Sequence, residues 1–220
     1  MTEMNFEQAR LNMIEQQIRP WEVLDQQVLD LLMEVPREEF VPPEFRKLAF
    51  TDMNIPLGHD EVMMSPKLEA RMLQALAIKP GDAVLEVGTG SGYVTALLGR
   101  LAKHVYSVDI HGDFVEAAQA KLSAHNIQNV TLDVGDAAHG WDKHTPYDVI
   151  CLTGSLPILP KAFMHQLAVG GRLFAIVGDP PVMDVMVITR VDQEDWARED
   201  IFETDLRPLK NAEQPERFVL

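Results

Sequence analysis

The stretch "VLEVGTGSGY", Val84–Tyr93, decides the fold of this chain. An apolar segment leads directly into glycines at alternate positions, Gly88, Gly90 and Gly92. Glycine lets the backbone turn sharply and approach a ligand closely, because it has no Cβ. The helix expected after the turn presents free N–H groups to an anionic part of that ligand. A strand, a glycine turn and a helix in this order are typical of the ligand-binding edge of an open α/β sheet.

Short apolar strands alternate with amphipathic helices from residue 83 onwards. We expect strands at 83–88, 104–110, 129–136, 147–154, 170–179, 182–191 and within 195–206, and helices at 93–102, 113–126 and 159–168. This alternation predicts a Rossmann-like, doubly wound α/β fold whose parallel sheet is covered on both faces.

The residues before this domain have the 3.6-residue apolar period of helices. The expected helices span 4–18, 23–35 and 66–78, and a loop is expected from about Thr51 to Met64. We therefore divide the chain into a helical N-terminal extension with a loop, residues 1–80, and the Rossmann-like domain, residues 81–220, which together form one compact unit.

Composition narrows the range of partners and compartments. The 220 residues carry a net charge of -15. Nucleic-acid binding draws most of its affinity from Lys and Arg, so this charge argues against such a partner. The single Cys151 excludes an internal disulfide and fits a reducing compartment. No apolar run is long enough to cross a bilayer, so we expect a cytoplasmic protein with no membrane partner. The sequence does not set the oligomeric state.

Acidic residues stand where the strands of the domain end. Asp109 follows the second strand and could accept hydrogen bonds from both hydroxyls of a ribose. The dinucleotide pattern G-x-G-x-x-G needs glycine where this chain has Tyr93, so NAD fits incompletely. The observed spacing is Glu-x-Gly-x-Gly-x-Gly, beginning at Glu86, which resembles motif I of the class I S-adenosylmethionine methyltransferases. In those enzymes the position of Asp136 and Ala137 contacts the adenine side of the cofactor.

The likeness extends over most of the chain. The segments "VPREEFVP", "FTDMNIPLG", "VLEVGTGSGY", "NVTLDVGDAAHGW" and "QLAVGGRLFAIVGD" occur in this order and resemble the protein-L-isoaspartate O-methyltransferase family from about Arg10 to Asp179. The resemblance implies S-adenosylmethionine as cofactor, bound by Glu86, Gly88, Gly90, Gly92, Asp109, Asp136 and Ala137. It implies methyl transfer to a carboxylate of a protein, peptide or small-molecule acceptor. A non-catalytic module that keeps the cofactor fold is the alternative from a different class.

The loop before the glycine domain departs from the family. The family reads approximately "PIGxGQTISQP", and its Thr and Ser line the acceptor site. An ungapped match from Pro56 to Pro66 places Val62 on the Thr and Met64 on the Ser. Ser65 then reads as a helix N-cap before Pro66, with a displaced catalytic serine as the alternative. No catalytic residue is assigned, and isoaspartyl activity is expected to be weak or absent.

Two further features of the acceptor side are open at this stage. His59, Asp60 and Glu61 suit either a solvated loop or a site for a cationic or hydroxyl-bearing substrate. No histidine and carboxylate have metal-ligand spacing, so no metal is expected. The family's C-terminal "VRFVPL" is replaced here by "DLRPLKNAEQPERFVL".

Overall fold

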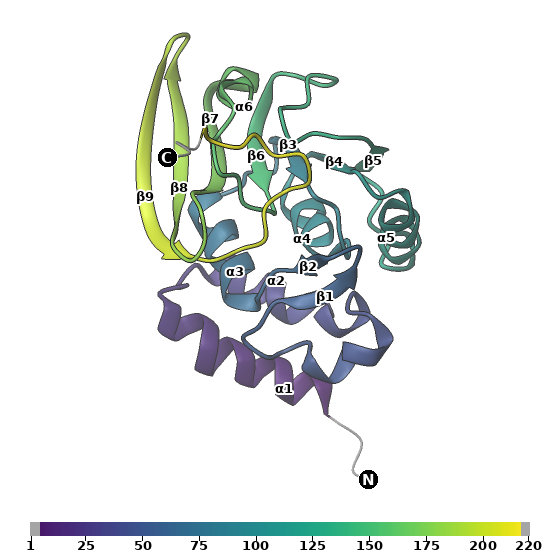
Figure 1. Cartoon of the computed structure of the whole chain (residues 1–220). Helices are drawn as coiled ribbons and strands as arrows, with labels where there is room; N and C mark the ends of the chain where they lie inside the picture. Colours follow the sequence, from purple (N-terminus) through teal and green to yellow (C-terminus); the bar gives the residue numbers. More distant parts are fainter. Residues whose placement is uncertain (1–4, 217–220) are drawn as a thin grey trace.

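The computed structural model describes residues 5–216, which form a twisted sheet with helices against it and a helical cap at one end (Figure 1). Met4, with which the first expected helix begins, and the last four residues of the expected domain lie outside these residues. The strands are β1 Ile55–Gly58, β2 Glu61–Met63, β3 Ala83–Val87, β4 His104–Asp109, β5 Val130–Val134, β6 Tyr147–Leu152, β7 Leu167–Val177, β8 Met183–Asp192 and β9 Asp195–Thr204. The helices are α1 Phe6–Met13, α2 Gln26–Glu34, α3 Pro66–Leu76, α4 Tyr93–Leu101, α5 Gly112–Ala124 and α6 Lys161–Gln166.

The main sheet has the order β5-β4-β3-β6-β7-β8-β9, which confirms the Rossmann-like α/β fold. The first five strands in this order, β5, β4, β3, β6 and β7, run parallel to one another. β3 lies between β4 and β6. The expectation of a fully parallel sheet is wrong at one edge, where β8 and β9 pair antiparallel. The connections before them, residues 178–182 and 193–194, are too short for a crossover, which takes a dozen residues or more.

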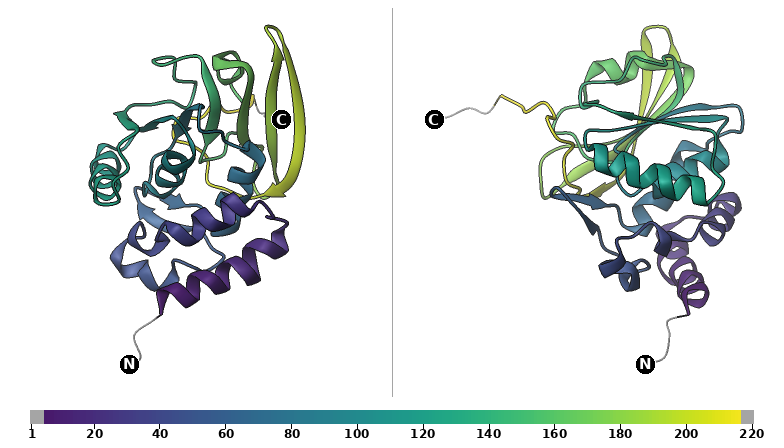
Figure 2. Two further views of the ribbon diagram at one scale, coloured as in Figure 1. Left: turned by 180° about the vertical axis from the view of Figure 1, so that it is seen from behind. Right: turned by 90° about the vertical axis from the view of Figure 1, so that its right-hand side faces the viewer.

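Helices cover the two faces of the sheet unequally. Val84, Cys151 and Phe174 share one apolar cluster with residues of α3, α4 and the N-terminal helices. Leu85, on the next position of β3, belongs to the other cluster, to which α6 contributes Phe163. Successive strand residues point to opposite faces, which explains the division. The second face is therefore covered by one short helix and by loops, not by a full helical layer (Figure 2).

The N-terminal residues pack directly onto the sheet domain. Met13, Ile55 and Leu73 lie in the same buried cluster as Val84 and Phe174. One continuous hydrophobic core therefore contains residues from both the helical N-terminal part and the sheet domain that begins near residue 80. Shorter helical pieces complete this part of the chain: a π-helical turn Ile14–Ile18 that continues α1, and 3₁₀ turns Arg19–Trp21, Arg37–Glu39 and Pro43–Leu48.

The expected loop at 51–64 contains a β-hairpin instead. β1 and β2 pair antiparallel, with Ile55 opposite Met63. His59 and Asp60 form the tip, and both have positive φ, 51° and 65°. A two-residue hairpin turn needs left-handed backbone at both central positions, and His and Asp are among the non-glycine residues that adopt it. The pair His59-Asp60 is not one of the Asn-Gly, Asp-Gly or Gly-Gly pairs that predict such a turn, which is why the sequence did not indicate the hairpin.

Candidate functional site

A cavity lies at the carboxyl ends of β3 and β4, beside the glycine turn. Gly88 and Gly90 line it and have φ values of 100° and 49°. A Cβ on Gly88 would overlap the Thr153 hydroxyl, which donates hydrogen bonds to the carbonyls of Val87 and Gly88 at 2.9 and 2.7 Å. Glycine is therefore required here by both backbone conformation and space. We call this space the main cavity.

Asp109 holds the rim of the main cavity through its carboxylate. One oxygen accepts from the backbone N–H of Gly90 at 2.8 Å, and the other accepts from that of His111 at 2.9 Å. The residue is 7% exposed and lines the cavity. Each carboxylate oxygen can accept more than one hydrogen bond, so acceptor capacity remains for a bound ligand.

The structure gathers five of the seven expected cofactor residues around the main cavity. Gly88, Gly90, Asp109, Asp136 and Ala137 line it, whereas Glu86 and Gly92 do not. Gly92 precedes α4, and a Cβ there would lie 2.9 Å from the Cβ of Ala118 on α5. Glu61 and Val62, which the sequence placed on the acceptor side, also line it, and the lining residues that the sequence reasoning missed are Leu57, Val87, Val108, Ile110, His111, Phe114, Gly135, Ala138, Thr153, Gly154 and Leu206–Lys210.

Glu86 supports the glycine turn from behind. Its Oε2 accepts hydrogen bonds from the hydroxyls of Thr95 on α4 and Ser107 on β4, both at 2.6 Å. Burial raises the pKa of this carboxyl to about 8. The two hydrogen bonds lower the pKa in part, and the negative charge of Asp109 raises it further. At neutral pH the group is therefore largely protonated and ties β3, β4 and α4 together.

This shift predicts a pH-dependent stability. Between about 4.5 and 8 the folded chain keeps the Glu86 proton that the unfolded chain releases. The free energy of unfolding is therefore expected to fall as pH rises through this range, by at most about 1.4 kcal/mol per pH unit. Glu86→Gln should flatten that slope in urea unfolding across the same range. Glu203→Gln, at an exposed position of β9, is the control; equal slopes in both variants would contradict the prediction.

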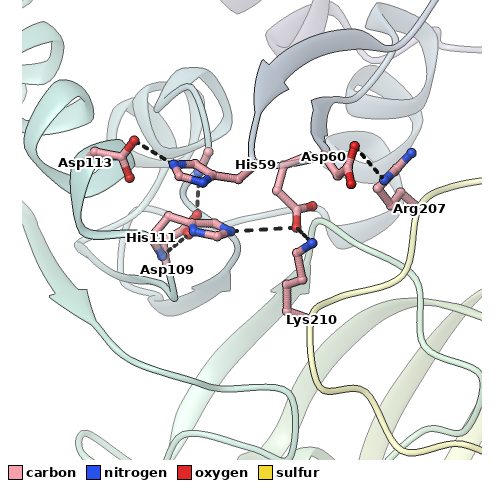
Figure 3. Close-up of polar contacts among 9 residues, drawn as sticks. His59, Asp60, Asp109, His111, Asp113, Arg207 and Lys210 are labelled. Carbon is pink, nitrogen blue, oxygen red and sulfur yellow. Dashed lines mark hydrogen bonds and ion pairs between the residues drawn. The ribbon is translucent and has the colours of Figure 1, made fainter.

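The hairpin tip lies over the main cavity and is held from two sides (Figure 3). His59 Nε2 lies 2.8 Å from Asp113 Oδ2 at the start of α5, and this hydrogen bond lowers the pKa of Asp113. On the other side, Asp60 Oδ1 lies 3.8 Å from Arg207 Nη1, and Glu61 Oε1 lies 3.6 Å from Lys210 Nζ. His59, Asp60 and Glu61, which could have formed a solvated loop, thus each contact a charged side chain of another segment.

His59, His111 and Asp113 also bring ligand atoms within 4.8 Å of one another, although their sequence spacing suggested no metal site. The rings of His59 and His111 stack face to face, with centroids 4.2 Å apart and an angle of 10°. Imidazole donates its lone pair in the ring plane, so one ion cannot lie in both planes. This arrangement is that of a stacked, hydrogen-bonded pair.

A segment after β9 closes the far side of the main cavity. We call residues 205–212 the C-terminal strap; in Figure 1 it crosses the carboxyl ends of the strands. Its backbone is fixed to Ser155, whose N–H donates to the Arg207 carbonyl at 3.0 Å and whose hydroxyl donates to the Leu206 carbonyl at 2.7 Å. Asn211 donates to Asp136 Oδ2 at 2.7 Å.

Two further spaces adjoin the main cavity. An outer groove of about 1160 Å³ shares with it the wall formed by Glu61, Val62 and Leu206–Lys210. An inner hollow of about 270 Å³ lies beside the glycine turn and is lined in part by Val62, Met63 and Met64. The two positions that depart from the family loop therefore face a space next to the glycine turn.

Ser65 is the N-cap residue of α3, as expected, with Pro66 next to it. Its hydroxyl makes no capping hydrogen bond; instead its backbone N–H donates to Asn54 Oδ1 at 3.0 Å. The residue is 7% exposed and lines none of the three spaces described above. The structure gives no support to a displaced catalytic serine.

Between residues 5 and 216, none of the helices combines the length and the apolar character needed to cross a membrane.

Known proteins match this chain along nearly its whole length. A family model described as Protein-L-isoaspartate(D-aspartate) O-methyltransferase (PCMT) matches residues 8–214. The protein-L-isoaspartate O-methyltransferase of Rhodopseudomonas palustris is 37% identical over 208 residues, which cover 93% of this chain and 95% of that protein. Protein-L-isoaspartate O-methyltransferase 2 of Pelobacter propionicus is 36% identical over 210 residues, 95% of this chain and 93% of that protein.

Solved structures agree in fold. A Plasmodium falciparum protein described as a protein-L-isoaspartate O-methyltransferase, crystallised with S-adenosyl-L-homocysteine, has a TM-score of 0.79 at 18% identity and covers 94% of this chain and 99% of its own. A second structure described as a protein-L-isoaspartate O-methyltransferase has a TM-score of 0.77 at 24% identity, with coverages of 92% and 66%. The motif resemblance is confirmed, and this chain belongs to the protein-L-isoaspartate(D-aspartate) O-methyltransferase family.

Proposed function

We propose that this chain transfers a methyl group from S-adenosylmethionine to a carboxylate of a protein or small-molecule acceptor. The observation that carries the proposal is the main cavity, which is lined by the glycine turn and the Asp109 carboxylate and shares a wall with the outer groove. Family membership makes the chain a methyltransferase and favours S-adenosylmethionine over NAD. It also favours an enzyme over a non-catalytic module.

The residues of the main cavity fit such a cofactor. Gly88 and Gly90 allow the backbone to approach the ligand, and Asp109 would hold ribose hydroxyls. Asp136 and Ala137 would lie against the adenine, while Glu86 and Gly92 would act indirectly by fixing the turn.

The chemistry asks mainly for positioning. S-adenosylmethionine supplies a methyl group already activated by its sulfonium. A carboxylate oxygen forms the new bond to the methyl carbon while the carbon–sulfur bond breaks, the electron pair stays on sulfur, and no proton moves. The chain must therefore hold the acceptor carboxylate in line, for which oriented reactions reach effective molarities of about 10⁵ M or more.

The first test is ligand binding. Titration calorimetry of the wild type with S-adenosylmethionine, S-adenosylhomocysteine and NAD is expected to show binding of both S-adenosyl ligands. Binding of NAD alone would overturn the proposal. Radiolabelled methyl transfer to an isoaspartyl peptide then tests the acceptor class, with an aspartyl peptide as its control.

Isoaspartyl turnover is expected to be weak and to rise in Val62→Thr. Valine and threonine have nearly the same shape, and the substitution returns one hydroxyl donor to the wall that Val62 shares with all three spaces. One charged hydrogen bond corresponds to about 1.5–3 kcal/mol, or about a tenfold or greater gain in kcat/KM. Met64→Ser is a poorer test, because Met64 is 3% exposed and its loss would leave a cavity.

The matched control is Val191→Thr, at an exposed position of β8. An equal gain in the control, or fast turnover by the wild type, would contradict the prediction. For location we propose the cytoplasm, supported by the single Cys151, which can form no internal disulfide and fits a reducing compartment.

A further inference from the structure

The main cavity and the outer groove meet at a wall that carries positive charge in an otherwise acidic chain. Arg207 and Lys210 line both spaces. Within the part of the chain that the structure describes, no other lysine or arginine is among the residues that line the main cavity or the outer groove. The chain as a whole has a net charge of -15. An anionic acceptor that passes from the groove toward the cavity would therefore meet these two cations first.

Two of the three hydroxyls beside the glycine turn are already engaged as donors; the third, that of Ser91, accepts from the Tyr93 N–H at 3.2 Å and faces the inner hollow, not the two spaces that Arg207 and Lys210 line. Thr153 donates to the Val87 and Gly88 carbonyls. The Thr89 hydroxyl lies 2.6 Å from that of Ser107, which itself donates to Glu86, so Thr89 is the donor of that pair. Val62 and Met64 stand at the positions where the family has hydroxyls, so these two positions supply no side-chain donor for a carboxylate.

Arg207 and Lys210, by contrast, are only loosely paired. Their contacts with Asp60 and Glu61 are 3.8 and 3.6 Å, beyond hydrogen-bond distance. Their side chains are 47% and 42% exposed. Ion pairs of this kind contribute little and exchange readily for a better partner. In Figure 3 both side chains point toward the β1–β2 hairpin, Arg207 toward Asp60 and Lys210 toward Glu61.

The backbone beneath these side chains is nevertheless fixed. The hydrogen bonds from Ser155 to the carbonyls of Leu206 and Arg207 and from the Leu209 N–H to the Ser155 carbonyl, at 2.9 Å, anchor the strap to the segment after β6. A guanidinium on a fixed backbone, with free rotamers, suits the planar, two-point recognition of a carboxylate.

We infer that Arg207, assisted by Lys210, binds the acceptor carboxylate in place of hydroxyls on the β1–β2 loop. Binding exchanges the loose Asp60 and Glu61 contacts for charge-assisted hydrogen bonds to the substrate. The inference rests on the proposed function, because it names the group that holds the acceptor of that same site. It makes the C-terminal strap, not the hairpin, the element that selects a carboxylate.

The test measures acceptor binding apart from turnover. A fluorescently labelled isoaspartyl peptide is titrated with the chain saturated by S-adenosylhomocysteine, and its polarisation is followed. Arg207→Gln is expected to weaken peptide binding about ten- to a hundredfold, with a smaller loss for Lys210→Gln. Both residues also line the main cavity, so the affinity for S-adenosylhomocysteine alone is measured for each variant, and the peptide titration is run at a concentration that saturates that variant.

Two controls separate this role from a general effect. Arg198→Gln removes an exposed arginine of β9 that lines neither space and should bind the peptide like the wild type. A peptide whose acceptor carboxylate is replaced by a carboxamide should bind the wild type as weakly as the carboxylate peptide binds Arg207→Gln. Equal affinity of the wild type for both peptides would overturn the inference, as would a loss in Ser91→Ala with none in Arg207→Gln.

Methyl transfer tests the proposed function, whereas peptide binding tests the role of Arg207. A wild type that binds the peptide through Arg207 but transfers no methyl group would refute the function and leave the inference standing. If Arg207→Gln methylated the peptide with an unchanged KM for the peptide, the inference would be refuted and the proposed function would stand.

Discussion

Replacing Arg37 by methionine is expected to lower the free energy of unfolding by about 3–5 kcal/mol. The guanidinium is fully buried and forms an ion pair with Glu69 on α3. It also donates to the carbonyls of Ala49 and Met64 at 2.8 and 2.7 Å. Burial raises the pKa of Glu69 and the Arg37 charge opposes that rise, so the variant leaves an unpaired buried carboxyl and unpaired carbonyls.

Urea unfolding followed by circular dichroism measures this loss. Arg19→Met is the control, because Arg19 and Glu15 form an exposed pair on one helix worth about 0.5 kcal/mol or less. Adding Glu69→Leu to Arg37→Met should recover part of the loss by removing the stranded carboxyl. Equal stabilities of Arg37→Met and Arg19→Met would show that the buried pair does not hold the N-terminal part to α3.

Asp109→Ala is expected to weaken binding of S-adenosylhomocysteine about a hundredfold or more. The carboxylate would accept from two ribose hydroxyls, each charged hydrogen bond being worth about 1.5–3 kcal/mol. It also accepts from the Gly90 N–H, so its loss loosens the glycine turn. Titration calorimetry gives the affinity, and thermal unfolding without ligand shows whether the variant is folded.

Asp113→Ala is the matched control for that measurement. Asp113 is exposed, lies four residues further along the chain and contacts His59 instead of the main cavity. A small effect is expected. If both variants bound S-adenosylhomocysteine like the wild type, Asp109 would have no part in holding the ribose.

The central strands and the helices beside them were predictable because their signals are local. Apolar runs such as that before Gly88 and the amphipathic period of α5 depend on near neighbours in sequence. The antiparallel edge could also have been predicted, since residues 178–182 leave no room for a crossover. The hairpin could not, because His59 and Asp60 can adopt left-handed backbone but do not form an Asn-Gly, Asp-Gly or Gly-Gly pair that marks a two-residue turn.

The site divides in the same way. The glycines and Asp109 follow from position at strand ends, and His111, two residues beyond Asp109, carried the same signal and was overlooked. Arg207 and Lys210 follow β9 in a segment with no periodicity. Hydrogen bonds between Ser155 and the C-terminal strap bring them to the cavity. Ser155 and the strap are about 50 residues apart, and a single sequence gives no signal that two such distant segments pair.

The continuous core sets the order in which this chain can fold as it is synthesised. Met13 and Ile14 leave the ribosome among the first residues, yet the cluster that buries them is completed by Phe174 and Ile176 of β7. The early helices must therefore wait, with apolar surface exposed, until most of the chain has been translated. Contacts so distant in sequence slow folding and expose intermediates to aggregation. We therefore expect the N-terminal residues to depend on the later strands for burial of their apolar side chains, and not to fold as an independent module.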